Sequence, residues 1–294
     1  MATLRFGYFP APDAGGLSDL IRRVRWADAN GLDLVGIQDH PYQRRFADTF
    51  SLLSYLAAVT DRITLLPDVA NLPLRGPAML AKQAATIDLL AGGRFELGLG
   101  AGGFWDAIAA MGGPRRTPGE SLQALREAIG VIRALWSEQR GLRVDGEHYS
   151  LSGVHGGPAP AHDIGIWIGG YGPRMMQLIG ELADGWIPSM AYVPPSALTE
   201  RTTLLHEAAV AAGRDPSAIR RVYNISGVIQ DDVVLSSKAI VGPVDYWVEC
   251  LLALAEEHQM DTFVLWARPE DEDAQLQQFA LEVAPAVRAE RLSQ

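Results

Sequence analysis

Short apolar runs alternate with amphipathic segments along almost the whole chain. Eight runs have the length and composition of strands: Leu4–Phe9, Leu34–Gln38, Ile63–Val69, Phe95–Gly100, Ile164–Gly169, Gly185–Met190, Arg221–Ile229 and Thr262–Ala267. Eight segments have helical periodicity: Leu17–Asn30, Thr49–Thr60, Pro77–Leu90, Glu120–Ser137, Pro173–Ala183, Ser196–Ala212, Pro243–His258 and Asp271–Glu290. Eight strands that each precede a helix within 294 residues favour an α/β fold of the (β/α)8 TIM-barrel type over a doubly wound sheet.

The clearest local signal lies in Ala81–Gly103 and the residues just before it. Pro77 suits the first turn of a helix, and Gly92 and Gly93 can adopt the left-handed conformation that ends one. Apolar residues recur between them at helical spacing: Met79, Leu80, Ala84, Ile87 and Leu90. Phe95–Gly100 then alternates like a strand and ends in glycines, where a ligand can approach the backbone closely.

Two segments depart from the alternation of strand and helix. Arg140–Asp163 contains the hairpin signal Asp145-Gly146 and a turn-rich continuation, so we expect an insertion at about residues 140–163, between the fourth helix and the fifth strand, over the barrel mouth. Gly103–Gly119 follows the fourth strand and is expected to line the same cavity. Because there is no low-complexity tail or clear linker, residues 1–294 are expected to form one domain.

Charge and cysteine content narrow the function classes. A formal charge of -10 without a Lys/Arg run disfavours nucleic acid as a partner and leaves small molecules. Cys250 is the sole cysteine, which excludes an intrachain disulfide, and its apolar neighbours predict a buried helical thiol rather than a nucleophile. The first residues show neither a secretory signal nor a membrane span, so a cytoplasmic location is expected.

Asp39 and His40 directly follow the second expected strand. In barrel enzymes the carboxyl ends of the strands meet the substrate, and a histidine there can exchange protons near neutral pH. The same two residues could instead end the strand through turn hydrogen bonds, and the residues alone leave both readings open.

The segment Gly169–Arg174 joins an apolar strand to a helix. A helix start presents free N–H groups to an anion, and Arg174 adds a positive charge, so a phosphate would fit. The segment lacks the Gly-Lys-Ser/Thr of a Walker loop, and glycines at such junctions also form simple turns.

Other catalytic classes find little support. No HxH, HExxH or CxxC arrangement is present, so a catalytic metal is not expected, and no G-x-S-x-G elbow supports a serine hydrolase. The remaining histidines fall on expected helices or in the expected insertion: His148, His155, His162, His206 and His258.

Three motifs, taken in order, resemble the luciferase-like monooxygenase superfamily: VGIQDH, LPLRGPAMLAKQAATIDLLAGGRFELGLGAG and GGYGPRMMQLIGELADGW. The resemblance covers Phe6 to Leu265. It implies a TIM barrel and an oxidoreductase that uses FMN or the deazaflavin coenzyme F420, with a slight preference for F420 because the chain is compact. It also suggests a homodimer built on outer helices and a separate reductase or dehydrogenase that supplies the reduced cofactor.

The resemblance also assigns roles to residues. It places His40 beside the cofactor ring, where it handles a proton or stabilises a charged intermediate, and Asp39 in contact with cofactor or substrate. Asp68 and Val69 match a bulge after the third strand that often contains a non-proline cis peptide behind the ring. The remaining expected cofactor contacts lie near the ring (Gly100, Ala101 and Gly102) or at the phosphate (Gly169, Gly170, Tyr171, Gly172 and Arg174).

The chain departs from the family pattern in two respects, the first of them relative to the deazaflavin-dependent sugar-phosphate dehydrogenases of this superfamily. Where those enzymes carry a glutamate after the fourth-strand glycines and a tryptophan four residues after the histidine, this chain has Gly103 and Arg44. Sugar-phosphate oxidation is therefore not expected. Asp68 replaces the small residue that is usual at the bulge.

The expected function is hydride transfer or oxygen insertion on a small, largely apolar organic substrate. Candidate residues for the apolar walls are Phe104, Trp105, Trp186, Met190 and Tyr192. A non-catalytic flavin-binding protein and a flavin-free barrel lyase or isomerase acting on a phosphorylated metabolite are the alternatives.

Overall fold

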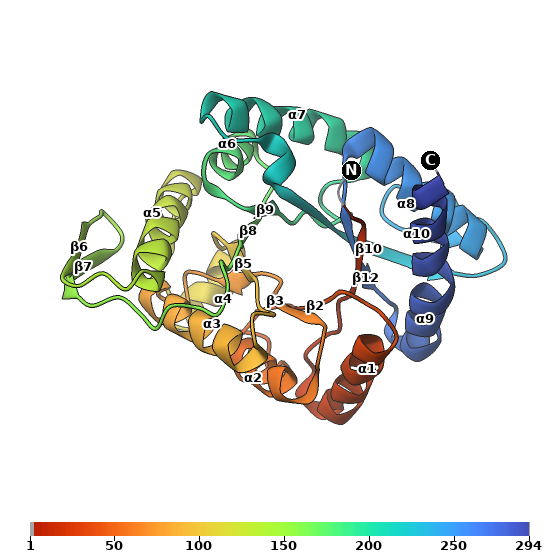
Figure 1. Ribbon diagram of the computed structural model, residues 1–294, viewed down its shortest axis with the longest axis horizontal. Coiled ribbons are helices and arrows are strands. Elements are labelled where there is room, and N and C mark those ends of the chain that lie inside the picture. The colour runs from red at the N-terminus through yellow and green to blue at the C-terminus, as the bar shows by residue number, and fades with distance from the viewer. Residues whose placement is uncertain (1–2, 294) are drawn as a thin grey trace.

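Parallel strands follow one another around the molecule in chain order (Figure 1). The structure is a computed structural model and describes residues 3–293. Seven barrel positions are β1 (Arg5–Tyr8), β2 (Leu34–Ile37), β5 (Leu97–Gly100), β8 (Ile166–Gly169), β9 (Gly185–Trp186), β10 (Arg220–Ile229) and β12 (Thr262–Trp266). The third position is divided into β3 (Thr64–Pro67), which pairs with β2, and β4 (Ala70–Asn71), which pairs with β5.

The sheet closes through this divided third position. A parallel bridge from Leu65 to Phe95 joins β3 to the residues just before β5. Further along, β4 pairs with β5, so both parts of the third strand position contact the fourth. The predicted (β/α)8 barrel is therefore confirmed. Two short strands escaped prediction: β4, which lies just after the expected run Ile63–Val69, and β11 (Ile240–Gly242), which pairs with β10 outside the barrel path.

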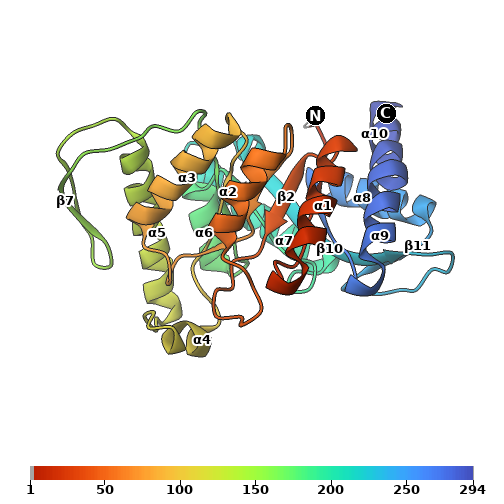
Figure 2. The same cartoon turned by 90° about the horizontal axis from the view of Figure 1, so that it is seen from below.

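Helices surround the barrel, as Figure 2 shows from the side. They are α1 (Leu17–Ala29), α2 (Thr49–Val59), α3 (Pro77–Ala91), α4 (Trp105–Ala110), α5 (Pro118–Trp136), α6 (Pro173–Leu182), α7 (Pro195–Ala211), α8 (Val244–His258), α9 (Glu272–Gln278) and α10 (Ala284–Ser293). A π-helical turn, Phe279–Val283, links α9 to α10, so the last predicted helix is one nearly continuous run. No helix within residues 3–293 is long and apolar enough to cross a membrane.

Helix α3 bears out one sequence prediction and corrects another. Gly92 and Gly93 have φ of 65° and 85°, the left-handed exit that the sequence predicted. The expected apolar face, however, is only partly buried: Met79 and Leu90 are 62% and 66% exposed. These two residues lie eleven positions apart, close to three helical turns, and so share the outer side of the helix.

The insertion forms an antiparallel hairpin of β6 (Leu142–Asp145) and β7 (Ser150–Val154). It lies on the flank of α5, outside the ring of helices (Figure 1). The Glu127 carboxylate on α5 accepts hydrogen bonds from the backbone N–H groups of residues 147, 148 and 149 in the hairpin loop. The expectation that the insertion covers the mouth is wrong, because a segment between a helix and the next strand belongs to the amino-terminal end of a barrel.

The barrel interior is filled by large side chains that face glycines. The large residues are Phe9, Leu34, Leu66, Trp167, Ile187, Val222 and Val264, with Val69 packed against them. A Cβ on Gly7 would lie 2.7 Å from Leu34 Cγ, and one on Gly185 would lie 2.6 Å from Trp167 Cγ. Glycines thus supply the volume that the large residues occupy, as dense interior packing requires.

The break between β3 and β4 places two side chains above this apolar layer. The Asp68-Val69 peptide is cis, as the resemblance implied. A Cβ on Gly100 would lie 2.7 Å from Val69 Cγ2, and one on Gly169 would lie 3.0 Å from the same atom. The space that the strand-end glycines leave is therefore taken by Val69.

We expect Gly98→Ala to destabilise the fold. Its Cβ would lie 2.1 Å from the Pro67 carbonyl oxygen and 3.2 Å from Val69 Cγ1, so the barrel wall must shift. Overpacking of this kind costs about 1 to 3 kcal/mol. Urea unfolding measures the loss, with Gly119→Ala in α5 as control, because a Cβ there meets open space and the change to alanine favours a helix by roughly 0.5 to 1 kcal/mol. Equal stability of G98A and the unmodified protein would contradict the packing described.

Candidate active site

His40 lies just beyond the carboxyl end of β2, in a group of three aromatic rings. Its ring centroid is 5.4 Å from that of Tyr42 and 5.5 Å from that of Phe104. Its Nδ1 is 2.5 Å from the Tyr42 hydroxyl. Burial lowers the pKa of His40, against a smaller raising effect of Asp39, so the imidazole is neutral at pH 7. A neutral imidazole can donate or accept a proton there.

Asp39 has a different environment from its neighbour. Its carboxylate is almost completely buried and accepts hydrogen bonds from Arg75 Nε at 2.7 Å and Nη2 at 2.9 Å, and from the Asn71 backbone N–H at 2.9 Å. Arg75 also pairs with Asp48 at 2.5 Å and lies over the Phe50 ring. Asp39 therefore fixes the end of β2 to the start of the loop before α3. Both carboxylate oxygens already have partners within the fold. The contact of Asp39 with a cofactor or substrate stays a prediction.

Asp68 crosses the top of the barrel interior. Its Oδ1 accepts a hydrogen bond from Asn224 Nδ2 at 3.1 Å, and Asn224 lies on β10, on the opposite wall. Its Oδ2 is buried without a partner and lies 3.0 Å from where a Cβ on Gly36 would be. Burial raises the pKa of Asp68 to about 7, which the hydrogen bond from Asn224 only partly offsets. The group is therefore divided between its acid and carboxylate forms near neutral pH.

The glycine-rich segment before α6 has the features of an anion site. Gly172 is the N-cap of the helix and offers no side-chain cap, so the first N–H groups of α6 keep their capacity for a ligand. Trp186 Nε1 donates to the Gly170 carbonyl at 2.8 Å and holds the loop from below. Arg174 is exposed and has no ion-pair partner within residues 3–293. A phosphate group fits this arrangement.

The same end of the barrel fits the ring of a flavin-type cofactor. Among residues 3–293, three buried oxygen atoms at this end lack a hydrogen-bond partner: Asp68 Oδ2, Asn71 Oδ1 and Asn224 Oδ1. Buried polar atoms without partners are rare in folded proteins and commonly mark functional sites. Below them lies the apolar layer of the barrel interior, so a polar ligand can approach this layer only from the carboxyl ends of the strands.

Exposed aromatic side chains surround that end. Phe104 is 55% exposed and contacts both His40 and Tyr42, so the Gly103–Gly119 segment, with α4, reaches the site as expected. Tyr171 and Tyr192 stack with centroids 6.2 Å apart. Figure 2 places α4 at the end of the barrel opposite the N-terminus.

The expected apolar walls need correction. Trp186 and Met190 are buried in the core between barrel and helices, so they do not face a substrate. Trp105 is half-buried beside Gly102, where a Cβ would lie 2.8 Å from its ring. Sequence reasoning missed Tyr42, which lies in the loop after β2, and Trp266, the last residue of β12; a position at the carboxyl end of a strand was the available signal.

Ala101 and Gly102 follow β5 at the same end of the barrel, and Ala101 is buried. Arg44 is exposed, and a Cβ on Gly103 would meet nothing within 4 Å. Neither position therefore supplies an acid or an aromatic ring to the site, which agrees with the departure noted from the sequence.

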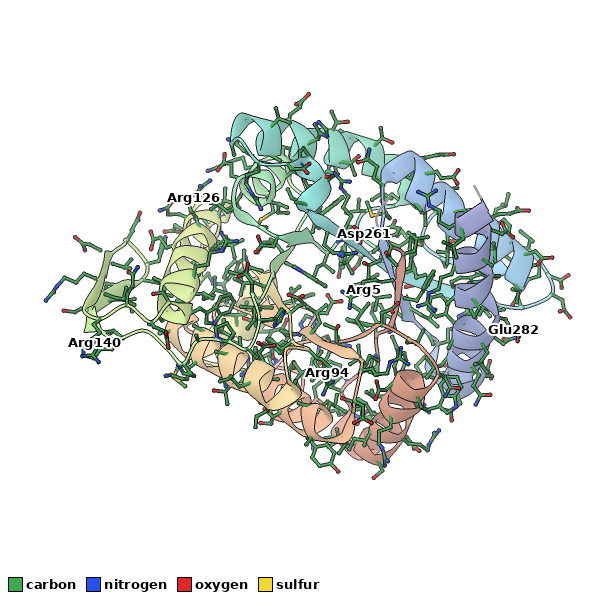
Figure 3. All side chains as sticks on the ribbon, in the orientation of Figure 1. Arg5, Arg94, Arg126, Arg140, Asp261 and Glu282 are labelled. Carbon is green, nitrogen blue, oxygen red and sulfur yellow. The ribbon has the colours of Figure 1, made fainter. Side chains whose placement is uncertain are left out.

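Charged groups at the opposite end of the barrel are engaged within the fold. Arg94 donates to the carbonyls of Ala57, Thr60 and Ile63. Arg5 donates to Thr64, and Asp261 accepts from the Arg221 backbone N–H (Figure 3). These groups hold the strand starts in place and present no reactive pair.

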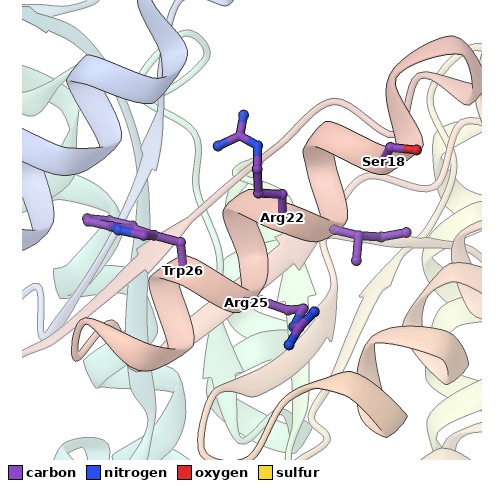
Figure 4. A pocket seen from close by; sticks show the side chains of 5 residues that line it. Ser18, Arg22, Arg25 and Trp26 are labelled. Carbon is purple, nitrogen blue, oxygen red and sulfur yellow. The ribbon is translucent and has the colours of Figure 1, made fainter.

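Two further features lie outside the site. A shallow surface pocket of about 370 Å³ on α1 is lined by Ser18, Ile21, Arg22, Arg25 and Trp26 (Figure 4). Its lining includes no acid or histidine, and it lies on the outer side of the helix ring. Within residues 3–293 no group of three or more His, Cys, Asp or Glu side chains has the arrangement of a metal site.

Comparison with known proteins gives matches over most of the chain. A family model described as luciferase-like monooxygenase matches residues 3–286. A 5,10-methylenetetrahydromethanopterin reductase of Archaeoglobus fulgidus is 36% identical over 184 residues, which is 62% of this chain and 52% of that protein. An F420-dependent glucose-6-phosphate dehydrogenase of Mycobacterium tuberculosis is 27% identical over 268 residues, 89% of this chain and 78% of that one. The match thus spans about half the length of the archaeal reductase.

A solved structure supports the fold. An F420-dependent secondary alcohol dehydrogenase in complex with an F420-acetone adduct superposes with a TM-score of 0.86 at 20% identity. The superposition covers 97% of this chain and 99% of that one. At 20% identity, this likeness shows a shared fold.

We expect the stability of Asp68→Asn, relative to the unmodified protein, to rise between pH 5 and pH 8. Because the pKa of Asp68 is raised, the folded state holds a proton that the unfolded state releases near pH 4. The free energy of unfolding of the unmodified protein therefore falls as the pH rises to about 7, and the effect of Asp68 is constant above that pH. Asparagine abolishes this titration. Between pH 5 and pH 8, the free energy of unfolding of D68N relative to the unmodified protein should rise by at most about 3 kcal/mol.

Urea unfolding at pH 5, 6, 7 and 8 measures this difference. The control is Asp231→Asn, because Asp231 is exposed. A stability difference for D68N that is the same at all four pH values would show that Asp68 ionises at its ordinary pKa.

Proposed function

We propose that this chain, which belongs to the luciferase-like monooxygenase family, binds coenzyme F420 or FMN at the carboxyl end of the barrel. The chain is an oxidoreductase like its relatives. The proposed substrate is a small, largely apolar organic molecule. One observation carries the proposal: His40 and the glycines Gly169–Gly172 follow the parallel strands β2 and β8 and so share one end of the barrel.

Contacts between the two groups support this arrangement. Val69 packs toward Gly100 and Gly169, between the third strand position and the start of α6. Burial, followed by smaller effects of Asp39 and Tyr192, raises the pKa of Tyr42, and Tyr192 stacks on Tyr171 in the glycine segment. Val69 and Tyr192 therefore link the residues proposed to face the ring with those proposed to face the phosphate.

Each side chain has a proposed task in the reaction. When bound, the cofactor supplies hydride transfer or, as reduced FMN, oxygen chemistry. His40 holds or moves a proton at Nε2, because its Nδ1 is engaged by Tyr42. The start of α6 and Arg174 bind the phosphate, and Phe104 with the Tyr171–Tyr192 pair excludes water from the reacting groups.

Relatives support coenzyme F420 as the first choice of cofactor. The names of the mycobacterial dehydrogenase and of the superposed alcohol dehydrogenase both state dependence on F420. FMN is the second choice, since the superfamily resemblance includes both. Oxidation of a sugar phosphate is not proposed, because Gly103 and Arg44 stand where the resemblance leads one to expect a glutamate and a tryptophan.

We expect Gly172→Asp to weaken cofactor binding tenfold or more while the fold is kept. Gly172 has φ -69° and ψ 153°, and a Cβ there meets nothing within 4 Å, so other residues are tolerated. Aspartate is a favourable N-cap and stabilises the helix, but its charge occupies the position proposed for the phosphate. Fluorescence titration with F420 and with FMN measures Kd.

Gly172→Asn is the matched control, because asparagine caps the helix equally well without a charge. It should bind the cofactor at least several-fold more tightly than G172D. If both variants bind like the unmodified protein, the phosphate lies elsewhere. If the unmodified protein binds neither F420 nor FMN, the proposed function is wrong.

We also propose that two copies of the chain associate through the outer faces of α2 and α3. Tyr55, Met79 and Leu90 are 53%, 62% and 66% exposed there, and α2 packs beside α3. Exposed apolar groups gathered on neighbouring helices favour association. A cytoplasmic location, a separate enzyme that reduces the cofactor, and action of residues 1–294 as one domain complete the proposal.

We expect the double variant Met79→Glu, Leu90→Glu to be monomeric. Sedimentation velocity should give about twice the chain mass of 31.8 kDa for the unmodified protein and a single chain mass for the variant. The control is Val210→Glu, because Val210 is a 56% exposed apolar residue on α7. A monomer in all three samples would end the dimer proposal without affecting the cofactor proposal.

A further inference from the structure

Tyr42 is the side chain that contacts His40 through a hydrogen bond. The backbone N–H of Gln43 donates to the His40 carbonyl at 2.8 Å, which closes a tight turn over residues 40–43. This turn brings the Tyr42 hydroxyl to 2.5 Å from His40 Nδ1. Within residues 3–293, the Tyr42 hydroxyl and the His40 ring nitrogens have no hydrogen-bonding partner other than each other.

Phe104 holds the pair in place from another part of the chain. Its ring meets the His40 ring edge-on, with an angle of 78° between the planes, and its centroid is 5.9 Å from that of Tyr42. Three rings from two loops therefore restrict the rotation of the imidazole. With Nδ1 engaged by Tyr42, only Nε2 remains for a substrate or cofactor atom.

Protonation of the two groups fixes the direction of the hydrogen bond. Burial, with smaller effects of Asp39 and Tyr192, raises the pKa of Tyr42 to about 12, so its phenol keeps its proton at neutral pH. Burial lowers the pKa of His40, so the imidazole is neutral and has one donor and one acceptor nitrogen. A phenol that keeps its proton and has one available acceptor donates that proton to Nδ1.

We propose that Tyr42 is a positioning residue for His40: its O–H donates to Nδ1, which keeps the imidazole proton on Nε2, and it returns a proton to His40 during turnover. The inference rests on the proposed function. When a substrate oxygen takes the Nε2 proton, the Tyr42 proton moves to Nδ1 and leaves a phenolate. Water then gives a proton to Nε2, its hydroxide passes to the bulk solvent, and Nδ1 returns its proton to the phenolate, so the starting Nε2–H tautomer is restored. The same steps in reverse serve an alcohol oxidation.

This relay has a place in the site because the acids around His40 are bonded to other groups. Gly103 stands where the resemblance leads one to expect a glutamate, and Asp39 is held by Arg75 and the Asn71 backbone N–H. Asp68 is bonded to Asn224 on the opposite wall. Among the titratable side chains of residues 3–293, Tyr42 alone forms a hydrogen bond with the imidazole.

Nitrogen-15 NMR of the full-length protein, labelled at its histidines and free of cofactor, tests the proposal. His40→Gln identifies the His40 signals among those of the six histidines. At pH 8 we expect the Nε2–H tautomer to predominate in the unmodified protein. In Tyr42→Phe we expect a mixture of both tautomers, and a His40 pKa higher by about 0.5 to 1, because loss of one neutral hydrogen bond destabilises the neutral ring by that much.

Tyr246→Phe is the matched control, since it removes the hydroxyl of a half-buried tyrosine on α8, outside the proposed site and the proposed dimer surface. It should leave both the tautomer and the pKa of His40 unchanged. A predominant Nδ1–H tautomer in the unmodified protein overturns the proposal without any variant, and so does a Y42F spectrum that matches the unmodified one.

Cofactor titration of the same samples separates this inference from the proposed function. Y42F should bind F420 or FMN with a Kd within about twofold of the unmodified value, because the phenol acts on His40 and not on the phosphate. Failure of the unmodified protein to bind either cofactor rejects the proposed function. The tautomer measurement in the ligand-free protein still decides whether Tyr42 orients His40.

Discussion

The packing of Val69 against glycines from two strands is the constraint on which the site depends. Val69 occupies the space left by Gly98, Gly100 and Gly169, and it lies on the apolar layer that fills the barrel. Larger residues at those glycines would collide with it, so the divided third strand and the glycine ends of β5 and β8 form one packing unit. Together they close the barrel from below and leave the carboxyl end as the surface where a ligand can bind.

Two acidic residues above that layer have different partners. The buried Asp39 carboxylate accepts hydrogen bonds from Arg75 and from a backbone N–H. Asp68 is buried with one amide donor, and burial raises its pKa to about 7. The first is an anchor between two segments, whereas the second changes its charge in the range where enzymes work. Removal of Arg75 would leave a buried unpaired charge, which is among the most destabilising changes in a protein.

Two neighbouring aromatic side chains define the surroundings of His40. Tyr42 and Phe104 restrict the ring, and the positions of Gly103 and Arg44 add neither an acid nor an aromatic group to it. Burial keeps the imidazole neutral, and the Tyr42 hydroxyl engages its Nδ1, so Nε2 is the nitrogen left for a ligand. A site built in this way has few groups that recognise a charged substrate, in agreement with the small apolar substrate proposed.

The sequence by itself determined the barrel, the place of His40 and the glycine segment before α6. Strand and helix periodicity are local properties, and parallel strands place all their carboxyl ends on one side, so the order of motifs was sufficient. Only the tertiary structure decided that Val69 fills the space of the glycines, that Asp39 is held by Arg75, that Asp68 reaches Asn224, and that the hairpin lies beside α5. These contacts join residues distant in the chain, and side-chain packing in three dimensions, which no local pattern encodes, selects them.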